Sequence, residues 1–375
     1  MILTQTPYRV SLFGGGSDYP EHFREHGGAT LGMAIDKFCY VGVKSMPPGQ
    51  ERSPGVPLRY RVQYSRVDDC VTRDEIRHPA VRGALQYYGI DEPLEFHCFG
   101  DLPGRAGLGG SSAFTVGLAH ALRVHGGINR LPVDAEVLAR DAISIEREVV
   151  KEAVGFQDQI TCTLGGVRAV EYTGEDQWAS RCIPLRPEFS AVLVHCLLLA
   201  YTGTMRDAHA MAARQIEALP QRVRVVRRMV AQAREWALHF SSEVILSPTA
   251  LGAALREAWE LKKAIMPEIT TPDIDALYER GLKLGATGGK LLGAGGGGFF
   301  LFCVLPEHRD AFVREIDVPC VAFNVCTHGT RVIIPVQSSL ALVISEDPLA
   351  LVISEDHDHD ARRRSPHVSI LRGKG

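Results

Sequence analysis

The sequence has 375 residues and contains no apolar run that approaches the roughly 20 residues needed for a membrane-spanning helix. It also has no excess of basic residues, because 41 lysines and arginines stand against 44 acidic residues. We therefore expect no membrane and no nucleic acid among its partners. The first ten residues, MILTQTPYRV, lack the charged-then-apolar layout of a signal peptide, so we expect a cytoplasmic protein.

The nine cysteines are odd in number, scattered, and include no Cys-x-x-Cys pair. This pattern disfavours a disulfide framework and a zinc site, and it is typical of reduced thiols in a cytosol. The remaining composition, 45% hydrophobic and 23% charged, is that of an ordinary soluble globular protein. The length is sufficient for two domains with sizeable cores.

Residues 101–121, DLPGRAGLGGSSAFTVGLAHA, join a glycine-rich loop to a helix but lack the Gly-Lys-[Ser/Thr] ending of a Walker A loop. Glycines let main-chain N–H groups converge on one point, and a helix N-terminus adds free N–H donors and partial positive charge. Such a junction binds phosphate. Ser111 and Ser112 stand at the N-cap, where a hydroxyl can also reach a metal bound to that phosphate. The alternative is an ordinary N-cap after a surface loop.

A second glycine cluster, Gly14, Gly15 and Gly16, ends the alternating strand expected at residues 7–13. Glycines at a strand end indicate a backbone that approaches another group closely. Asp18 follows them and could accept hydrogen bonds from substrate hydroxyls, or it could simply cap the turn. Arg9 lies within the strand, so we expect it to face an anion, either in a structural ion pair or at a phosphate.

Residues 155–166, GFQDQITCTLGG, place Asp158 between two glutamines. A carboxylate held among amides can be positioned without being neutralised and could take a proton or bind a cation. The alternative is an aspartate that starts a helix. The amphipathic helix expected at 133–150 carries Glu146 and Glu148, which would ordinarily be solvated.

The third glycine cluster is in residues 285–302, GATGGKLLGAGGGGFFLF. Gly293, Gly295 and Gly298 satisfy G-x-G-x-x-G, but a strand follows them instead of a helix, so we reject a dinucleotide site. A loop of this kind between two strands predicts close packing against another backbone, or a lid against the first loop.

Other segments predict the connecting elements. We expect two short strands in 28–44, a loop in 47–57, a buried strand in 189–200 and a strand in 320–325. Helices are expected near 205–219, 222–240, 249–265 and 272–284. After residue 336 the chain carries a tandem repeat, LALVISEDP and LALVISEDH, followed by a charged tail. We expect this part to be poorly ordered and assign it no catalytic role, although the apolar repeat could pair with a sheet edge.

The order and spacing of PYRVSLFGGGSDYP, LPGRAGLGGSSA and KLLGAGGGGFFLF resemble the GHMP kinase superfamily over about residues 1–335. The resemblance implies an α+β fold with two domains. A ribosomal protein S5 domain 2-like domain would span 1–188, a ferredoxin-like domain would span 189–336, and the tail would span 337–375. The variants FGGGSDYP, GFQDQ and GGKLLGAGGGGFF are most like the D-glycero-D-manno-heptose 7-phosphate kinase branch, and L-fucokinase-type enzymes share parts of the pattern.

The resemblance also assigns roles. Asp158 matches the catalytic base, and Arg9 would hold it ionised or contact the transferred phosphate. Ser111 and Glu146 match the magnesium ligands, with Ser112 and Glu148 as alternatives. The ATP phosphates would bind at Pro103, Gly104, Gly107, Leu108, Gly109, Gly110, Ser111 and Ser112. The substrate would bind at Gly15, Gly16, Ser17, Asp18, Thr202, Gly203, Arg206, Gly295 and Gly296.

These assignments imply an ATP-dependent sugar kinase that uses Mg²⁺ and phosphorylates a sugar or sugar phosphate, by resemblance at the anomeric hydroxyl of a heptose 7-phosphate. Another sugar, such as L-fucose, galactose or an amino sugar, is the first alternative. A non-catalytic sensor on the same fold is the second. Arg206, Lys44 and Arg105 are candidates for the substrate's own phosphate, and a homodimer is among the expected assemblies.

Overall fold

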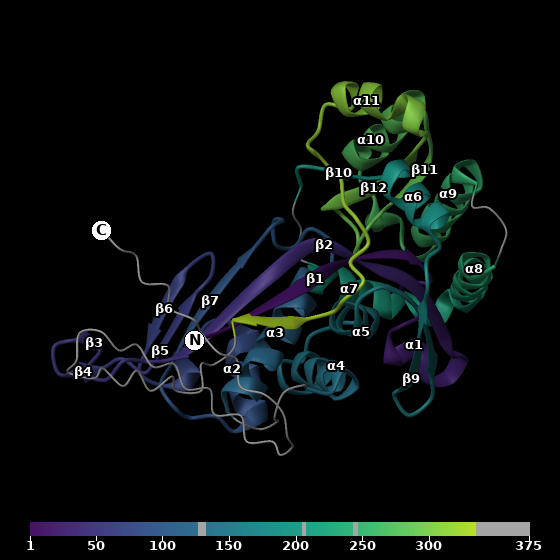
Figure 1. The fold of residues 1–375 in the computed structure, drawn as a ribbon. Helices are drawn as coiled ribbons and strands as arrows, with labels where there is room; N and C mark the ends of the chain where they lie inside the picture. Colours follow the sequence, from purple (N-terminus) through teal and green to yellow (C-terminus); the bar gives the residue numbers. More distant parts are fainter. Residues whose placement is uncertain (127–132, 205–207, 243–246, 335–375) are drawn as a thin grey trace, which may run out of the picture. The chain divides into compact units, whose positions relative to one another are not determined.

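The computed structural model describes residues 1–126, 133–204, 208–242 and 247–334. They belong to one compact unit, Met1–Pro335 (Figure 1). The LALVISED repeat and the rest of the predicted tail at 337–375 lie outside the described residues, as does Arg206.

An eight-stranded sheet is formed mainly by the first half of the chain. Its order is β14-β1-β2-β7-β5-β6, and β8 and β9 extend it from the early part of β2. The strands are β1 (Ile2–Phe13), β2 (Gly28–Ser45), β5 (Tyr60–Gln63), β6 (Val67–Cys70), β7 (Leu94–Gly100), β8 (Val167–Thr173), β9 (Gln177–Ile183) and β14 (Arg331–Ile334). The associated helices are α1 (Pro20–His26), η1 (Arg73–Glu75), α2 (Pro79–Tyr88), α3 (Gly110–His125), α4 (Ala135–Ser144), η2 (Ile145–Val149) and α5 (Gln157–Leu164).

Helix α3 packs against β1 and β2 and is buried along most of its length. Its small and apolar residues allow this close packing. A Cβ at Gly117 would lie only 2.8 Å from Thr6 Oγ1 and 3.1 Å from Thr4 Oγ1 on β1. Helix α5 packs beside α3 and also contacts β1. This arrangement brings the start of α5 and the start of α3 to the same end of β1.

The predicted pair of short strands in 28–44 is wrong, because β2 is one strand of 18 residues. Its first six residues pair with β8, and its last seven pair with β7. Strand β1 pairs along most of its length, with a register shift between Pro7 and Arg9. Two strands, β8 and β7, therefore pair with successive parts of the same edge of β2, and this explains why its sequence pattern predicted two strands.

The second half of the chain forms a four-stranded sheet of order β11-β12-β10-β13. Its strands are β10 (Leu197–Tyr201), β11 (Ala286–Leu291), β12 (Phe299–Val304) and β13 (Cys320–Val321). The helices are α6 (Pro187–Cys196), α7 (Ala208–Ala218), η3 (Leu219–Gln221), α8 (Val223–Ser241), α9 (Pro248–Ile265), η4 (Pro267–Ile269), α10 (Pro272–Lys283) and α11 (Pro306–Glu315). Figure 1 shows α9, α10 and α11 grouped with this sheet.

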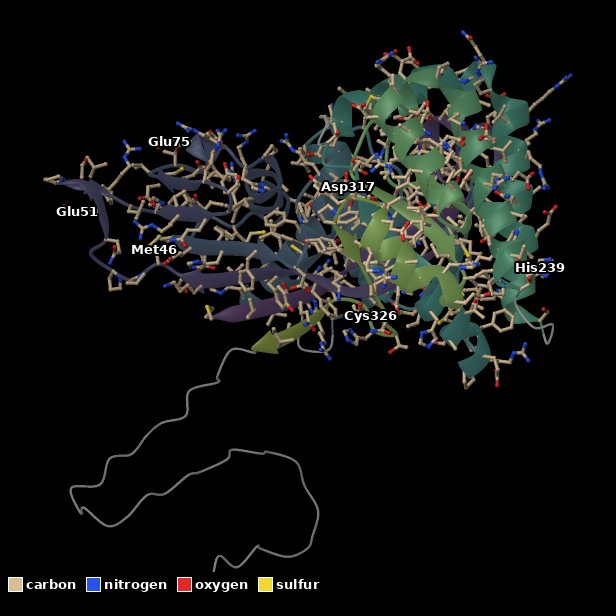
Figure 2. The ribbon with its side chains drawn as sticks, turned by 90° about the horizontal axis from the view of Figure 1, so that it is seen from above. Met46, Glu51, Glu75, His239, Asp317 and Cys326 are labelled. Atoms are coloured by element: carbon tan, nitrogen blue, oxygen red, sulfur yellow. The ribbon has the colours of Figure 1, made fainter. Side chains whose placement is uncertain are left out.

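Three further predictions are corrected. The buried strand expected at 189–200 is helix α6 followed by β10. An apolar run without alternation suits either a buried strand or a buried helix, and Pro187 occupies the first turn of this helix. The helix expected at 133–150 is present over residues 135–149, but its last five residues, 145–149, form a π-helical turn that follows α4 directly. The loop at 47–57 contains a small hairpin, β3 (Glu51–Ser53) and β4 (Val56–Pro57), at one extremity of the sheet, where Figure 2 labels Glu51.

The chain returns to the first sheet after β13, where the expected strand at 320–325 covers only two residues. At Cys326, which Figure 2 labels, the N–H donates to the Ala34 carbonyl at 2.9 Å and the carbonyl accepts from the Gly166 N–H at 2.7 Å. Strand β14 then pairs with β1. Residues 326–334 therefore complete the first sheet, although the predicted domain boundary assigned them to the second domain. The boundary at 188 falls inside α6 and stays a prediction.

Candidate active site

The first glycine loop connects β7 to α3. Gly109 is the N-cap of α3 and has a left-handed backbone with φ +70°, and its carbonyl accepts from the Ala113 N–H at 2.8 Å. The N–H groups of the first turn have no partner within a helix, so they present donors at this end. Ser111 is exposed there, whereas Ser112 is buried. Pro103, Gly104 and Arg105 are exposed in the preceding loop.

The glycine cluster before β12 packs directly on this loop. A Cβ atom at Gly293 would lie 2.4 Å from the Gly107 Cα, and one at Gly298 would lie 2.5 Å from the Ala106 oxygen. The Phe299 N–H donates to that same oxygen at 2.9 Å. The predicted close packing between glycine-rich backbones is therefore present, and only glycine leaves room for it.

Arg9 and Asp158 form a bidentate ion pair beside the first loop. Arg9 Nε lies 2.6 Å from Asp158 Oδ1, and Nη2 lies 2.7 Å from Oδ2. Arg9 Nη1 also donates to the Gly107 carbonyl at 2.7 Å. A Cβ at Gly109 would lie 3.3 Å from Asp158 Oδ2, so the carboxylate lies next to the N-terminus of α3.

The two partners differ in solvent contact, with side chains 5% exposed for Arg9 and 23% exposed for Asp158. Burial disfavours the arginine charge, but Asp158 opposes this effect and the pKa of Arg9 is raised. Asp158 is thus held by a permanent cation, not by the flanking amides that the sequence suggested. Its charge is paired while one edge remains open to solvent.

Asp18 is 2% exposed and already fully engaged by the protein. Its oxygens accept from the Gly16 N–H at 2.9 Å, from the Gln157 N–H at 3.2 Å and from Gln157 Nε2 at 3.1 Å. Burial raises its pKa against these hydrogen bonds. The observed contacts fix the turn before α1, and the contact of Asp18 with substrate hydroxyls stays a prediction.

Glu146 is 1% exposed and lies next to Ser112, on the π-helical turn after α4. Its Oε2 accepts from Ser112 Oγ at 3.0 Å and from Gln159 Nε2, while its Oε1 has no partner among the described residues. Burial raises the pKa of Glu146 to about 7. Glu148, the sequence alternative, is exposed and accepts from Ser144 Oγ.

This cluster suits the magnesium ion that the sequence resemblance implied. Carboxylate, hydroxyl and amide oxygens are the ligands that Mg²⁺ prefers, and a bound cation would stabilise the charged form of Glu146. The unpaired Glu146 oxygen is available to such an ion. Ser112 would hold it with Glu146, since the buried Ser112 hydroxyl donates to Glu146 whereas the Ser111 side chain is exposed.

The remaining predicted substrate residues lie in or beside the loop at 292–298, between β11 and β12, which packs on the first glycine loop and is called here the second glycine loop. The Thr202 N–H donates to the Gly298 carbonyl at 2.9 Å, and the neighbouring Gly203 has φ +75°. A Cβ at Gly295 would lie 2.9 Å from an Ile269 side-chain carbon, and the Gly296 N–H donates to the Ile269 carbonyl.

Four predicted substrate residues, Gly15, Gly16, Ser17 and Asp18, lie in the turn after β1. Ser17 is buried and donates to the Gly14 carbonyl at 2.8 Å, while a Cβ at Gly15 would lie 3.3 Å from Gln157 Nε2. Lys44, a candidate for a substrate phosphate, forms an ion pair with Glu95 at the opposite end of β2.

Sequence reasoning missed two buried lysines. Lys290 Nζ donates to the Ser11 and Leu12 carbonyls at 3.1 and 2.9 Å, at the end of β1. Lys262 Nζ donates to the Leu291 and Gly293 carbonyls at 2.9 and 2.6 Å. The Lys in GGKLLGAGGGG was the available signal, but a lone lysine in a strand is ordinarily read as exposed.

The comparisons with known proteins agree with this arrangement. The family model "GHMP kinases N terminal domain" matches residues 76–166, and "GHMP kinases C terminal" matches residues 244–317. The chain belongs to the GHMP kinase superfamily. The predicted fold class and the predicted class of enzyme, an ATP-dependent sugar kinase, are confirmed at the level of this family.

Relatives of this GHMP kinase act on several acceptors, as their names state. D-glycero-alpha-D-manno-heptose 7-phosphate kinase of Campylobacter jejuni is 24% identical and covers 84% of this chain and 93% of its own. The bifunctional fucokinase/GDP-fucose pyrophosphorylase of Arabidopsis thaliana is 25% identical and covers 86% of this chain and 32% of its own. The galactokinase of Roseiflexus sp. is 25% identical and covers 84% of this chain and 86% of its own.

Among solved structures, a D-glycero-D-manno-heptose 1-phosphate kinase from Bacteroides thetaiotaomicron has a TM-score of 0.68. It is 20% identical and covers 88% of this chain and 98% of its own. The galactokinase of Lactococcus lactis complexed with galactose has a TM-score of 0.63 at 16% identity, with 88% and 94% covered. These likenesses show the fold.

Proposed function

We propose that this GHMP kinase transfers the γ-phosphate of ATP to the anomeric hydroxyl of D-glycero-D-manno-heptose 7-phosphate. The observation that carries the proposal is the Arg9–Asp158 pair beside the N-terminus of α3, where Ser112 in the first turn of α3 donates to Glu146 on the π-helical turn after α4. The heptose phosphate follows from the FGGGSDYP and GFQDQ variants and from the Campylobacter jejuni relative.

Phosphoryl transfer depends mainly on positioning and on stabilising charge. In the proposed mechanism, the N–H groups of Gly109, Gly110 and Ser111 bind ATP phosphate oxygens. Ser112 and Glu146 would hold the magnesium ion, which would supply positive charge to offset the negative charge of the phosphates. Asp158 accepts the proton of the attacking hydroxyl or orients that hydroxyl, and Arg9 holds the Asp158 carboxylate in place through the bidentate pair. The packed second glycine loop excludes water from this side of the phosphates.

The experiment is a panel of free sugars and sugar phosphates, with ATP consumption as readout and ³¹P NMR to locate the new phosphate. We expect the highest kcat/KM for the heptose 7-phosphate and a product with an anomeric phosphate. A preference for free L-fucose or galactose would contradict the proposed acceptor but would leave the assignment as a sugar kinase unchanged. ATP binding without turnover on every acceptor would instead favour the non-catalytic sensor.

No helix among the described residues is long and apolar enough to cross a bilayer. The cytoplasmic location, the homodimer and the absence of nucleic acid among the partners stay predictions.

A further inference from the structure

Two buried oxygen atoms next to the phosphate loop lack any partner among the described residues. They are Glu146 Oε1 and Gln159 Oε1, on side chains that are 1% and 0% exposed. A buried acceptor without a hydrogen bond costs about 1–3 kcal/mol. Two such acceptors on side chains that contact each other call for an explanation by a cation or another donor.

The contacts around Glu146 explain which of its oxygens is available. Gln159 Nε2 and Ser112 Oγ both donate to Oε2, so this oxygen is engaged on two sides. Both donors therefore leave Oε1 as the free oxygen. Without Gln159, only the hydroxyls of Ser112 and Thr115 would remain beside the carboxylate, and its orientation would be less restricted.

The position of Gln159 is set by the residue before it. Asp158 is held by Arg9, and α5 packs against both α3 and α4. Consecutive helical residues point about 100° apart. The same turn that presents Asp158 toward Arg9 therefore directs the Gln159 side chain toward Glu146.

We propose that Gln159 is a positioning residue of the cation site, which fixes Glu146 through Oε2 and leaves Oε1 for the divalent cation that accompanies ATP. This inference rests on the proposed function, because it assumes that a nucleotide brings the cation to this helix start. It adds a residue that acts through Glu146 and has no contact with the transferred phosphoryl group.

The chain contains a matched control. Gln232 on α8 is 1% exposed, its Nε2 donates to Glu257 Oε2 and to the Ala254 carbonyl, both at 3.0 Å, and its Oε1 also lacks a described partner. Gln232→Leu therefore removes a buried amide with a similar glutamate contact, on a helix that contributes none of the proposed site residues. Comparison with Gln159→Leu separates loss of a buried amide from loss of cation positioning.

The test measures binding of Mn²⁺, as a probe for Mg²⁺, by electron paramagnetic resonance in the presence of saturating ADP. We expect Gln159→Leu to raise the Kd for Mn²⁺ by about 10- to 100-fold, the usual cost of removing a group that orients a metal ligand. Gln232→Leu should stay within about twofold of the native chain. The Mg²⁺ concentration for half-maximal turnover should rise in parallel, while the KM for the acceptor is unchanged.

A Kd for Gln159→Leu within twofold of a native chain that binds Mn²⁺ and ADP would overturn the inference and leave the kinase proposal intact. Failure of the native chain to bind Mn²⁺ with ADP would overturn the cation site, and the inference with it. Thermal unfolding establishes that each variant is folded. Should Gln159→Leu not fold, Gln159→Met keeps the length of the side chain without its amide and is measured in the same way.

Discussion

At the scale of single residues, Arg9 and Asp158 serve each other in two ways. The guanidinium is nearly excluded from water and has only Asp158 as a described carboxylate partner, at 2.6 and 2.7 Å. The carboxylate is therefore part of the stability of β1 as well as a candidate base. A substitution at Asp158 tests both roles, and its effect on activity must be separated from its effect on folding.

We expect Asp158→Asn to lower kcat by about 10²–10⁴-fold, because an amide cannot accept the proton of the hydroxyl. It should also lower the free energy of unfolding by about 3–5 kcal/mol, because a buried arginine loses its anion. Activity per folded molecule and chemical denaturation measure the two effects. Asp176→Asn breaks a bidentate pair with Arg24 that is largely exposed, and should change stability by less than about 1 kcal/mol. Native kcat in Asp158→Asn would contradict the assigned role.

Lys290 gives a second prediction at this scale. Burial lowers its pKa to about 7, whereas an unfolded lysine holds its proton to about pH 10. Between these values the unfolded state binds more protons, so the stability of the native chain rises with pH. Relative to Lys290→Met, the native chain should gain about 2–4 kcal/mol from pH 6.5 to 9.5. Urea unfolding at several pH values measures this.

Lys263, a half-buried lysine that forms an ion pair with the exposed Glu260, supplies the control for that measurement. The Lys263→Met curve should run parallel to the native curve throughout the pH range. Parallel curves for Lys290→Met as well would show that the Lys290 ammonium is not destabilised by burial.

At the scale of elements, the two glycine loops form one unit although they are almost 190 residues apart in sequence. Gly107 and Gly293 both have positive φ, and each lies against the backbone of the other loop. Close packing there was predictable, because a strand follows the second loop. Its partner was named only as an option, since glycine density indicates a close approach but not the group approached.

We expect Gly293→Ala to lower stability by about 2 kcal/mol or more and to raise the KM for ATP, because the new Cβ would displace the Gly107 backbone. Gly89 has a similar φ of +65° but open space around a Cβ, so Gly89→Ala should cost only about 1 kcal/mol and leave the KM unchanged. Thermal unfolding and steady-state kinetics measure both variants. Equal effects at the two glycines would show that φ alone, not loop packing, sets the cost.

Errors in the elements have physical causes of the same kind. The single strand β2 looked like two because its partner changes from β8 to β7 along its length. The apolar stretch at 189–200 suited a buried strand or a buried helix, and tertiary packing chose α6 followed by β10. Periodicity identified buried segments well, but neighbours that are distant in sequence decided their form.

At the scale of the whole molecule, the three glycine motifs were sufficient to predict the fold class. Together with the GFQDQ segment they predicted that Asp158, Arg9 and the first serines of α3 share one site. The sequence could not decide between Ser111 and Ser112, or between Glu146 and Glu148, as the metal ligand. The choice depends on which side chain points inward. It did not reveal that Asp18 is already occupied by Gly16 and Gln157. Burial and the direction of side chains need the assembled fold.

The compact unit Met1–Pro335 contains every described residue of the candidate site. We therefore expect a chain ending at residue 336 to keep the native kcat and KM within about twofold, and a Tm within about 2 °C. Steady-state kinetics and calorimetry on the shortened chain measure this. A large loss of activity or of Tm would show that the residues after 336, which include the LALVISED repeat, contribute to catalysis or stability.

The order Gln157, Asp158, Gln159 has a consequence for which mutations this part of the gene can accept. These neighbours in one turn of α5 reach three separate acidic or basic partners: Asp18, Arg9 and Glu146. Deleting or inserting one codon just before them would rotate the whole set and disconnect all three at once. In a library of all single-codon substitutions, insertions and deletions, this short stretch should therefore tolerate some amino-acid substitutions but no insertion or deletion.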